Sequence, residues 1–142
     1  RFIARRMIVL ASEDIGNADP QALLVAVAAA QAVEHVGLPE ARINLAQAAT
    51  YLARAPKSNA SYKALGAAAA DVRERGHLRP PDALRSASYA GARKLGRGEG
   101  YVYPHDDPEG FEVDCLPDEL KGRVYFTPSG NGEEADRPRG PR

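Results

Sequence analysis

The residue types best suited to chemistry are one cysteine, three histidines and the carboxylates that surround one of the histidines. Cys115 together with any of the histidines has the composition of a nucleophile and its base. His105 lies next to Asp106 and near Asp114, as in a metal site, but the spacing matches neither a zinc site nor a calcium loop. We therefore interpret this segment as turns, and Cys115 as a small apolar residue of a short strand.

A second group of carboxylates, Glu13, Asp14 and Asp19, lies in one loop after Ser12. Two carboxylates divide acid and base roles only where their surroundings separate their pKa values. A solvent-facing loop between helices gives no such difference, so we expect helix capping and contacts between domains here. Farther along, the segment Pro56–Asn59 precedes a predicted helix, where it either holds an anion or forms a plain turn and cap.

Gly91 and Gly96 have the spacing of the two P-loop glycines, but Arg97 and Gly98 stand where that loop needs a lysine and a hydroxyl. We interpret these glycines as a helix end and a turn. A basic stripe runs through the same region, with cations or a tyrosine at every fourth residue. Because arginines neutralise phosphates and tyrosine stacks on bases, the stripe either contacts DNA or a partner or is a solvated face. Its residues are Arg85, Tyr89, Arg93, Lys94 and Arg97.

The elements that must position these groups are helices. Of the 142 residues 26 are alanine, the strongest helix former, and the net charge is zero, which argues against disorder. Apolar periodicity, capping residues and terminal glycines predict five helices. They cover about 2–11, 20–36, 39–54, 58–76 and 82–95. We expect a mainly α fold, an antiparallel bundle or collar-like cluster of helices, with an extended Gly/Pro-rich C-terminal arm that can hold a short hairpin.

Composition divides the chain into three parts. Residues 1–97 are predicted to form a helical oligomerisation core, and 98–129 an extended arm packed on that core, with short strands at 111–115 and 123–127. Residues 130–142 contain mostly glycine, proline and charged residues, which bury too little apolar surface to offset chain entropy. We expect that tail to be disordered.

Cysteine content and hydropathy indicate a location. One cysteine excludes an intrachain disulfide framework and fits a reducing cytoplasm. The longest apolar run, Ala22 to Ala30, is shorter than the ~20 residues that span a bilayer, so we expect a soluble protein with no membrane contact. The chain starts without methionine and inside a helical pattern, which suggests a fragment of a longer polypeptide.

The predicted helix 20–36 is apolar nearly all round, which is typical of a helix that is central or shared between subunits. Alanines let helix backbones approach closely enough for symmetric packing. We therefore expect this helix and its neighbour 39–54 to supply contacts between copies of the chain. The candidate interface residues are Leu23, Val27, Ala30, Val33, Leu45 and Leu52.

Four strings of the sequence carry a family resemblance: SEDIGNADP at 12–20, LARAPKSN at 52–59, KLGRGEGYVYPHD at 94–106 and LPDELKGRVYFTPSGNG at 116–132. Together they resemble the C-terminal region of the replication-associated recombination protein A family, also called RarA or MgsA, relatives of the Werner-helicase-interacting ATPase. The sequence after Gly132 and the stretch 79–85 depart from the family pattern. The structural positions that match family motifs are Ser12, Glu13, Asp14, Asn17, Asp19, Pro20, Pro56, Lys57, Ser58, Asn59, Tyr101, Tyr103, Pro104 and His105.

The resemblance implies a function that the residues alone do not. Members of the family are AAA+ ATPases that act at stalled replication forks, with ATP and magnesium bound in an N-terminal domain. Their C-terminal domain resembles the clamp-loader collar and makes a homotetramer, and members associate with DNA and single-stranded-DNA-binding protein. The chain has no Walker motif. We therefore expect the chain to be a non-enzymatic collar domain that binds no cofactor or metal. We expect a bacterial, cytoplasmic protein that associates with the nucleoid. The alternative is a module that contacts DNA or single-stranded-DNA-binding protein.

Overall fold

The computed structural model describes residues 1–103, 105–106 and 114–136. The chain forms two compact units. Unit 1 comprises Arg1–Ala69 and Tyr125–Arg137, and unit 2 comprises Ala70–Val124 and Pro138–Arg142. The boundaries at 69 and 124 differ from those that composition predicts, at 97 and 129. Composition registers where glycine and proline accumulate, whereas a compact unit is defined by which segments pack together.

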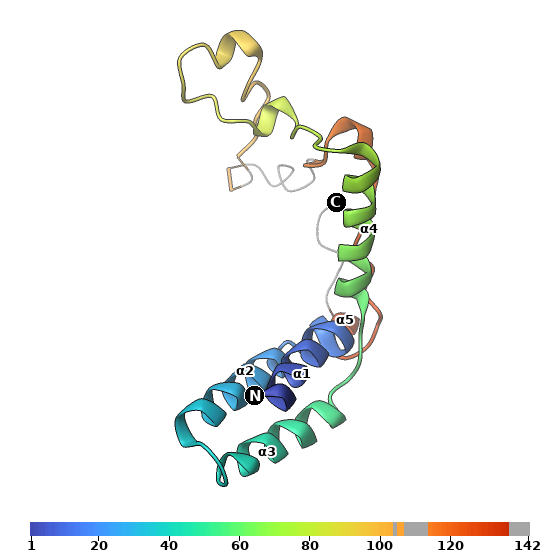
Figure 1. Ribbon diagram of the computed structural model, residues 1–142. Coiled ribbons are helices and arrows are strands. Elements are labelled where there is room, and N and C mark those ends of the chain that lie inside the picture. Colours follow the sequence, from blue (N-terminus) through green and yellow to red (C-terminus); the bar gives the residue numbers. More distant parts are fainter. Residues whose placement is uncertain (104, 107–113, 137–142) are drawn as a thin grey trace. The chain divides into compact units, whose positions relative to one another are not determined.

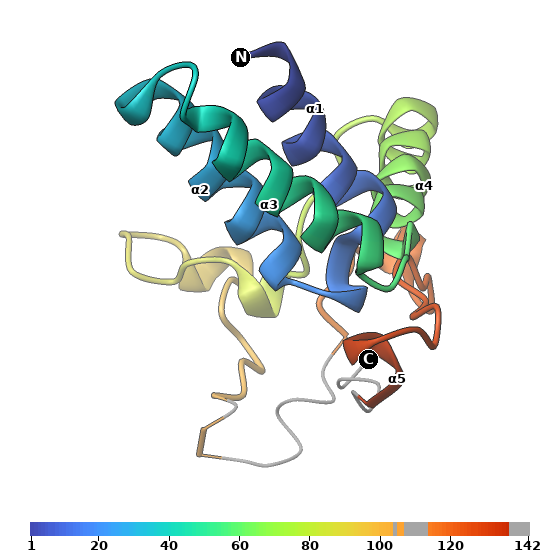
Figure 2. The same cartoon turned by 90° about the horizontal axis from the view of Figure 1, so that it is seen from below.

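Three helices form the body of unit 1: α1 (Phe2–Leu10), α2 (Gln21–Val36) and α3 (Ala41–Arg54). Figures 1 and 2 show α2 and α3 as an antiparallel pair, with α1 lying alongside both. Between α1 and α2 the chain continues as a π-helical turn, Ala11–Ile15, and a 3-10 turn, Gly16–Ala18. The first helix was expected to end near residue 11. At that point the α-helix changes into the π-helical turn, and the chain then reverses direction.

Small side chains allow these helices to pack closely. On α2 the buried positions are Ala22, Ala26 and Ala29, which recur at helical spacing, and Ala48 and Leu52 are buried on α3. Ile15, in the π-helical turn, is the largest side chain among the described residues that is fully buried. The core is therefore an alanine-lined seam with few large side chains inside it.

The predicted boundaries of these helices are confirmed. Asp19 Oδ1 accepts the backbone N–H of Gln21 at 3.0 Å, which satisfies a free donor of the first turn of α2. The same helix ends at Gly37, whose φ of 74° is in the left-handed region that glycine adopts at low cost. After the tight turn that follows, α3 begins at Ala41, two residues after the predicted start, and ends at Arg54, as the sequence predicts.

The fourth predicted helix is confirmed as α4 (Ala60–Arg75), which ends before Gly76. Its residues 60–69 belong to unit 1 and its last six to unit 2. A short helix, α5 (Glu133–Asp136), lies in unit 1. The prediction of disorder from residue 130 is wrong for 130–136, because Glu134 is only 5% exposed and is held by hydrogen bonds. Residues 137–142 lie outside the described part.

The prediction of a fifth helix at 82–95 is wrong. Unit 2 has short 3-10 turns instead, at Asp82–Leu84, Arg93–Leu95 and Asp118–Leu120. Between the first two turns, Ser86 Oγ lies 2.8 Å from Ser88 Oγ and accepts the backbone N–H of Ser88. Serine hydroxyls compete in this way with helical backbone bonds, and Gly91 has a φ of 89° that a helix does not allow.

The arm in unit 2 is anchored to the last turns of α4. Arg123 donates from Nε and from its terminal nitrogen to the two carboxylate oxygens of Asp71, at 2.8 and 2.9 Å, and Asp71 is buried. Residues 123–127 are irregular and not a strand, as are 114 and 115, while 111–113 lie outside the described part. The predicted hairpin is therefore not formed by the described residues, and the mainly α class is confirmed. No helix of the described residues is long and apolar enough to span a membrane.

Candidate functional site

Two of the predicted motif segments, 12–20 and 56–59, meet in unit 1. The backbone N–H of Ser58 donates to the carbonyl oxygen of Asp14 at 2.8 Å, and Asn17 Nδ2 donates to Ser61 Oγ at 3.3 Å. Gly16 lets the two backbones approach, since its φ is 54° and a Cβ there would lie 3.0 Å from the Ser58 carbonyl oxygen. The loop before α2 and the connector before α4 thus form one joint, called here the loop junction.

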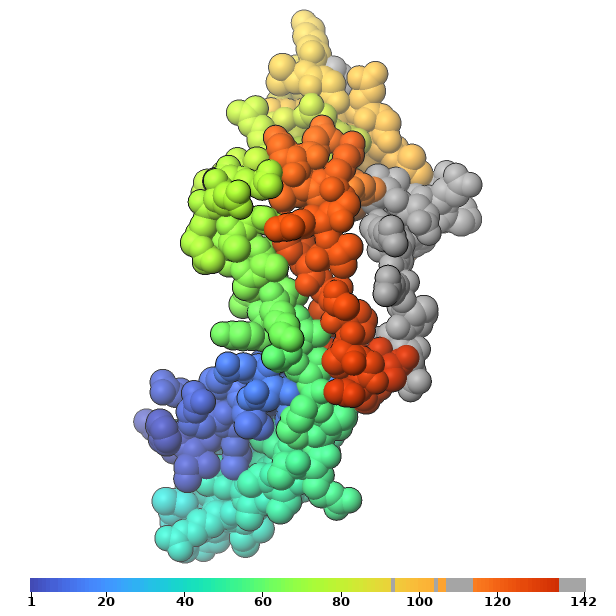
Figure 3. Space-filling view, turned by 90° about the vertical axis from the view of Figure 1, so that its right-hand side faces the viewer, coloured from blue at the N-terminus to red at the C-terminus, as the bar shows by residue number. Residues whose placement is uncertain are grey.

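A third segment, 129–134, completes the loop junction from the C-terminal side. Ser58 Oγ donates to the Glu134 carboxylate, with contacts of 3.0 and 2.9 Å to its two oxygens. The backbone N–H and the hydroxyl of Ser129 donate to Glu134 Oε2, each at 2.7 Å. Figure 3 shows this C-terminal segment, in red, lying against the start of α4. Sequence reasoning missed Glu134, because nothing local distinguishes it from the charged residues that follow.

The Glu134 carboxylate is held in its ionised form by these donors. Burial raises the pKa of its carboxyl, but the backbone N–H of Ser129 and the hydroxyls of Ser129 and Ser58 lower it, and the net shift is below the ordinary value. Ser58 Oγ itself accepts the backbone N–H of Ala60 at 3.2 Å, so the bonds form a chain from α4 to α5. Such a chain fixes the position of all three segments.

Close backbone packing supports the same contact. Gly132 has a φ of 52°, and a Cβ at this position would overlap the carbonyl oxygen of Ala18 and lie 2.6 Å from Pro56 Cγ. Next to it, Asn131 Nδ2 donates to the carbonyl oxygen of Lys57 at 2.9 Å. The loop junction therefore has no room for a side chain at position 132.

The segment 56–59 was expected either to hold an anion or to form a plain turn and cap, and the contacts of Lys57 favour the turn and cap. Its ammonium group donates to the carbonyl oxygens of Leu52, Ala53 and Ala55, the first at 3.0 Å and the second at 3.4 Å. A cation at these carbonyls caps the C-terminal end of α3 and complements its dipole. The segment is thus a turn and cap, and its lysine is not directed toward an anion.

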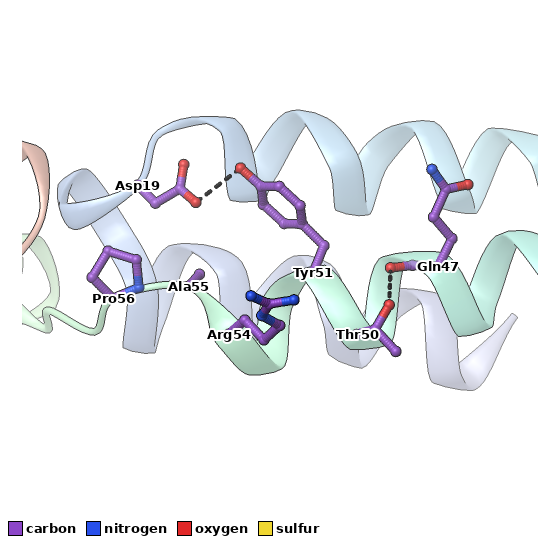
Figure 4. A pocket seen from close by; sticks show the side chains of 7 residues that line it. All are labelled: Asp19, Gln47, Thr50, Tyr51, Arg54, Ala55 and Pro56. Atoms are coloured by element: carbon purple, nitrogen blue, oxygen red, sulfur yellow. Dashed lines mark hydrogen bonds between the residues drawn. The ribbon is translucent and has the colours of Figure 1, made fainter.

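Asp19, expected to cap a helix, has a second contact in a shallow pocket between the ends of α2 and α3. The Tyr51 hydroxyl donates to Asp19 Oδ2 at 2.9 Å (Figure 4). This bond raises the pKa of the Tyr51 hydroxyl, because ionisation would place two anions together. The pocket has a volume of about 510 Å³, and Gln47, Thr50 and Arg54 also line it. Both Asp19 oxygens are thus occupied by donors, as in a capping residue rather than a general base.

The other carboxylates of that loop, and the polar residues near them, lie at the surface. Asp14 contributes its backbone carbonyl to the loop junction, and Ser12 and Asn59 are exposed. Glu13 is half-buried, and Pro20 directly precedes α2. These residues therefore lie in the loop junction or directly beside it.

The predicted basic stripe does not exist as a helical face, because the helix that would carry it is absent. Arg85 forms an ion pair with Asp82 at 2.8 Å, and the Arg97 guanidinium lies over the Tyr89 ring, 5.1 Å from its centroid. Lys94 is exposed, and Arg93 begins a 3-10 turn. The two arginines are therefore engaged within unit 2, and the four-residue spacing does not align them.

The motif around residues 101–106 also lies in unit 2. Tyr101 and Tyr103 are exposed, and the Tyr103 and His105 rings have centroids 5.2 Å apart. Pro104 lies outside the described residues. Cys115, expected in a strand with an apolar environment, is exposed instead. Across the part of the chain that the structure describes, no group of three or more His, Cys, Asp or Glu could hold a metal ion.

The candidate interface residues divide into two groups. Leu52 is 2% exposed and lies in the core of its own chain, so it offers no surface to a neighbour. Ala30, Val33 and Leu45 are half-buried, whereas Leu23 and Val27 are exposed on α2. Apolar spacing along a helix reveals which residues are buried or paired, but it does not separate contacts within a chain from contacts between chains.

The fold and the loop junction define a mainly helical domain in which a C-terminal segment ties two interhelical loops together. Residues 1–139 match the family model described as MgsA AAA+ ATPase C terminal. The chain belongs to this family, and the resemblance seen in the sequence is confirmed.

Individual relatives support the same assignment. The chain is 51% identical over 137 residues to an AAA domain-containing protein of Mycobacterium tuberculosis, covering 96% of the chain and 30% of the relative. It is 46% identical over 135 residues to replication-associated recombination protein A of Coxiella burnetii, covering 94% and 31%. It is 46% identical over 132 residues to the protein of the same name from Bacillus subtilis, covering 92% and 31%. The chain thus spans about a third of the length of these relatives.

Proposed function

We propose that this chain is an oligomerisation domain that gathers copies of an AAA+ ATPase of the replication-associated recombination type into a tetramer. The observation that carries the proposal is the apolar surface of α2 that its own chain leaves uncovered. Of its 16 residues, the polar ones are Gln21, Gln31, Glu34 and His35. A helix of this composition is normally covered on several sides.

Unit 1 covers a narrow part of that surface. The buried stripe consists of alanines, whereas the large side chains Leu23, Leu24 and Val27 are exposed, Leu24 by 62%. They occupy the first half of α2, and Gln31, Glu34 and His35 occupy the exposed side of the second half. Burying one leucine side chain contributes about 1.5–3 kcal/mol, so a contact with a second copy has a clear source of free energy.

The rest of the proposal concerns the longer protein. The printed sequence has no Walker motif, and we infer that ATP and magnesium are bound outside it, in the N-terminal part of the ATPase. The alternative function, contact with DNA or single-stranded-DNA-binding protein, is less favoured. Its best residues, Arg85 and Arg97, are engaged with Asp82 and Tyr89.

Sedimentation of the purified chain tests the proposal. We expect an oligomer at micromolar concentration, and replacement of Leu24 by Gln should weaken the association by roughly tenfold or more, since a buried apolar anchor is lost. The matched control is Leu24→Met, which keeps the length and the helix propensity of the side chain and restores its apolar end. The control should associate like the unaltered chain.

Two results would contradict the proposal. A monomer at all concentrations up to about 100 times those of a cell would remove the oligomerisation function, given that interfaces of this kind bind in the micromolar range or tighter. Equal weakening by Gln and Met would show that shape rather than apolar contact matters at position 24. Circular dichroism of both variants establishes that α2 remains helical.

A further inference from the structure

A second apolar surface of unit 1 is a groove between α1 and α3. It has a volume of about 370 Å³. Phe2, Ile3, Met7 and Leu10 line it from α1, and the exposed residues Ala49 and Ala53 contribute from α3. Phe2 and Ile3 are exposed although they are large and apolar. A concave apolar surface of this kind fits a protruding apolar side chain.

The charge at this groove is positive. Arg6 lines it and is exposed, and it forms no ion pair with any of the described residues. Lys57 also lines the groove, but its ammonium group is held by the carbonyl oxygens at the end of α3. Arg6 is therefore the cation that is available to a carboxylate of an occupant.

The turn between α2 and α3 is an apolar feature at one end of the helix pair, and it carries a carboxylate. Here called the hairpin tip, it consists of residues 36–43 and ends the α2–α3 pair in Figure 2. Leu38 and Ile43 are 68% and 72% exposed, and Val36 is exposed as well. Glu40, directly before α3, is exposed and forms no ion pair with the described residues. The hairpin tip thus offers an apolar side chain that can enter the concave groove and a carboxylate that can pair with Arg6.

The hairpin tip of a chain cannot enter its own groove. Glu40 precedes the first turn of α3, and the groove lies beside the last half of the same helix, near Leu52. Twelve residues of helix separate these positions by roughly 18 Å, at about 1.5 Å per residue. Because α3 is rigid, the occupant must come from another molecule.

We propose that the groove between α1 and α3 receives the hairpin tip of a second copy of this chain, with Leu38 in the groove and Glu40 beside Arg6. The proposal rests on the oligomerisation function proposed above and adds a second contact to the one argued for the exposed leucines of α2. The two surfaces of such a contact differ, so each copy offers a tip to one neighbour and a groove to the other. A contact of this head-to-tail type builds a ring when the rotation between copies closes.

Charge reversal with rescue tests the pairing. We expect Arg6→Glu and Glu40→Arg each to weaken association of the chain by roughly tenfold in sedimentation, because each places like charges together. The double variant Arg6→Glu/Glu40→Arg should restore association. Arg42→Glu, a reversal of a neighbouring exposed charge on α3, is the matched control and should have a smaller effect than the reversal at Glu40.

A disulfide test locates the contact directly. In a background with Cys115→Ser, one sample carries Leu38→Cys and another Met7→Cys, and the two differ in mass through a tag. Mixing under mild oxidation should give the mixed disulfide as the main product. With Gln31→Cys, on the second half of α2, in place of Leu38→Cys, the mixed product should be minor.

The outcomes separate this proposal from the oligomerisation function. If the unaltered chain is a monomer, both proposals are wrong. If the chain associates but neither charge reversal weakens it, the tip-in-groove contact is wrong and oligomerisation stands. If both reversals weaken association and the double variant does not restore it, the two residues do not face each other, and a different partner surface fills the groove.

Discussion

Glu134 is a buried carboxylate whose charge is compensated, among the described residues, by hydrogen-bond donors rather than by a cation. Ser58 and Ser129 supply the hydroxyls, and the backbone N–H of Ser129 supplies a further donor. Charge-assisted bonds of this kind are stronger than bonds between neutral groups. A single side chain thereby joins the start of α4, the loop at 129 and α5.

The lowered pKa of Glu134 predicts how stability depends on pH. The ionised form is favoured in the folded state, so its contribution is complete above the ordinary carboxyl value and is lost as the pH falls through the lowered one. We expect Glu134→Gln to reduce the free energy of unfolding by about 1–3 kcal/mol near neutral pH. The NH2 of the glutamine amide would face N–H and hydroxyl donors, so at least one of their hydrogen bonds would be lost. Denaturant unfolding should show this deficit shrinking at strongly acidic pH.

The matched control is Glu119→Gln, at an exposed glutamate of unit 2. It removes the same charge without removing a buried partner, so its effect should stay within about 0.5 kcal/mol. A deficit for Glu134→Gln that is as large in acid as at neutral pH would contradict the role assigned to the ionised carboxylate.

Particular residues show which structural features could be predicted from the sequence and which could not. The composition after 130 predicts disorder, yet Glu134 finds a partner 76 positions earlier in the chain, and no local pattern contains that information. Leu52 was predicted at an interface because it lies on an apolar stripe, but the stripe faces its own core. By contrast, Asp19 and Gly37 were assigned correctly, because capping and a left-handed φ are local properties.

Among the elements, α1 to α4 follow from local signals that agree with one another. Apolar periodicity, a capping residue and a terminal glycine all indicate the same boundaries for α2. The predicted helix 82–95 had the cap and the spacing, but two serines and Gly91 weaken its interior. The apolar spacing alone predicted a helix here, although the residues between the apolar positions have low helix propensity.

The alanine seam between α2 and α3 predicts an asymmetry within one helix. Ala48 is buried in the seam and Ala46 is exposed on the same helix. Enlarging Ala48 to leucine should force the helices apart and cost about 1–3 kcal/mol of unfolding free energy, since a close-packed interior has no space for it. Ala46→Leu, the same substitution with the same helix propensity, should change stability by less than about 0.5 kcal/mol. Equal effects in thermal unfolding would contradict the packing described for α3.

At the scale of the whole molecule, the chain buries mostly small side chains and exposes many large ones. Its fully buried residues are largely alanines, while Phe2, Leu24, Leu38 and Ile43 are among those exposed. Small domains are marginally stable because they bury a limited fraction of their surface. Under the proposed oligomerisation function, contacts between copies would supply part of the stability of the fold as well as the assembly.

This coupling predicts that thermal stability depends on concentration. Association of folded chains shifts the folding equilibrium by mass action, so a hundredfold increase in concentration should raise the melting temperature by about 5 °C. Leu24→Gln should melt at a temperature that changes little over the same range, and Leu24→Met should follow the unaltered chain. Calorimetric scans with reversible rescans measure both. A melting temperature of the unaltered chain that is independent of concentration would mean that unit 1 is stable alone, and that its exposed leucines serve something other than self-assembly.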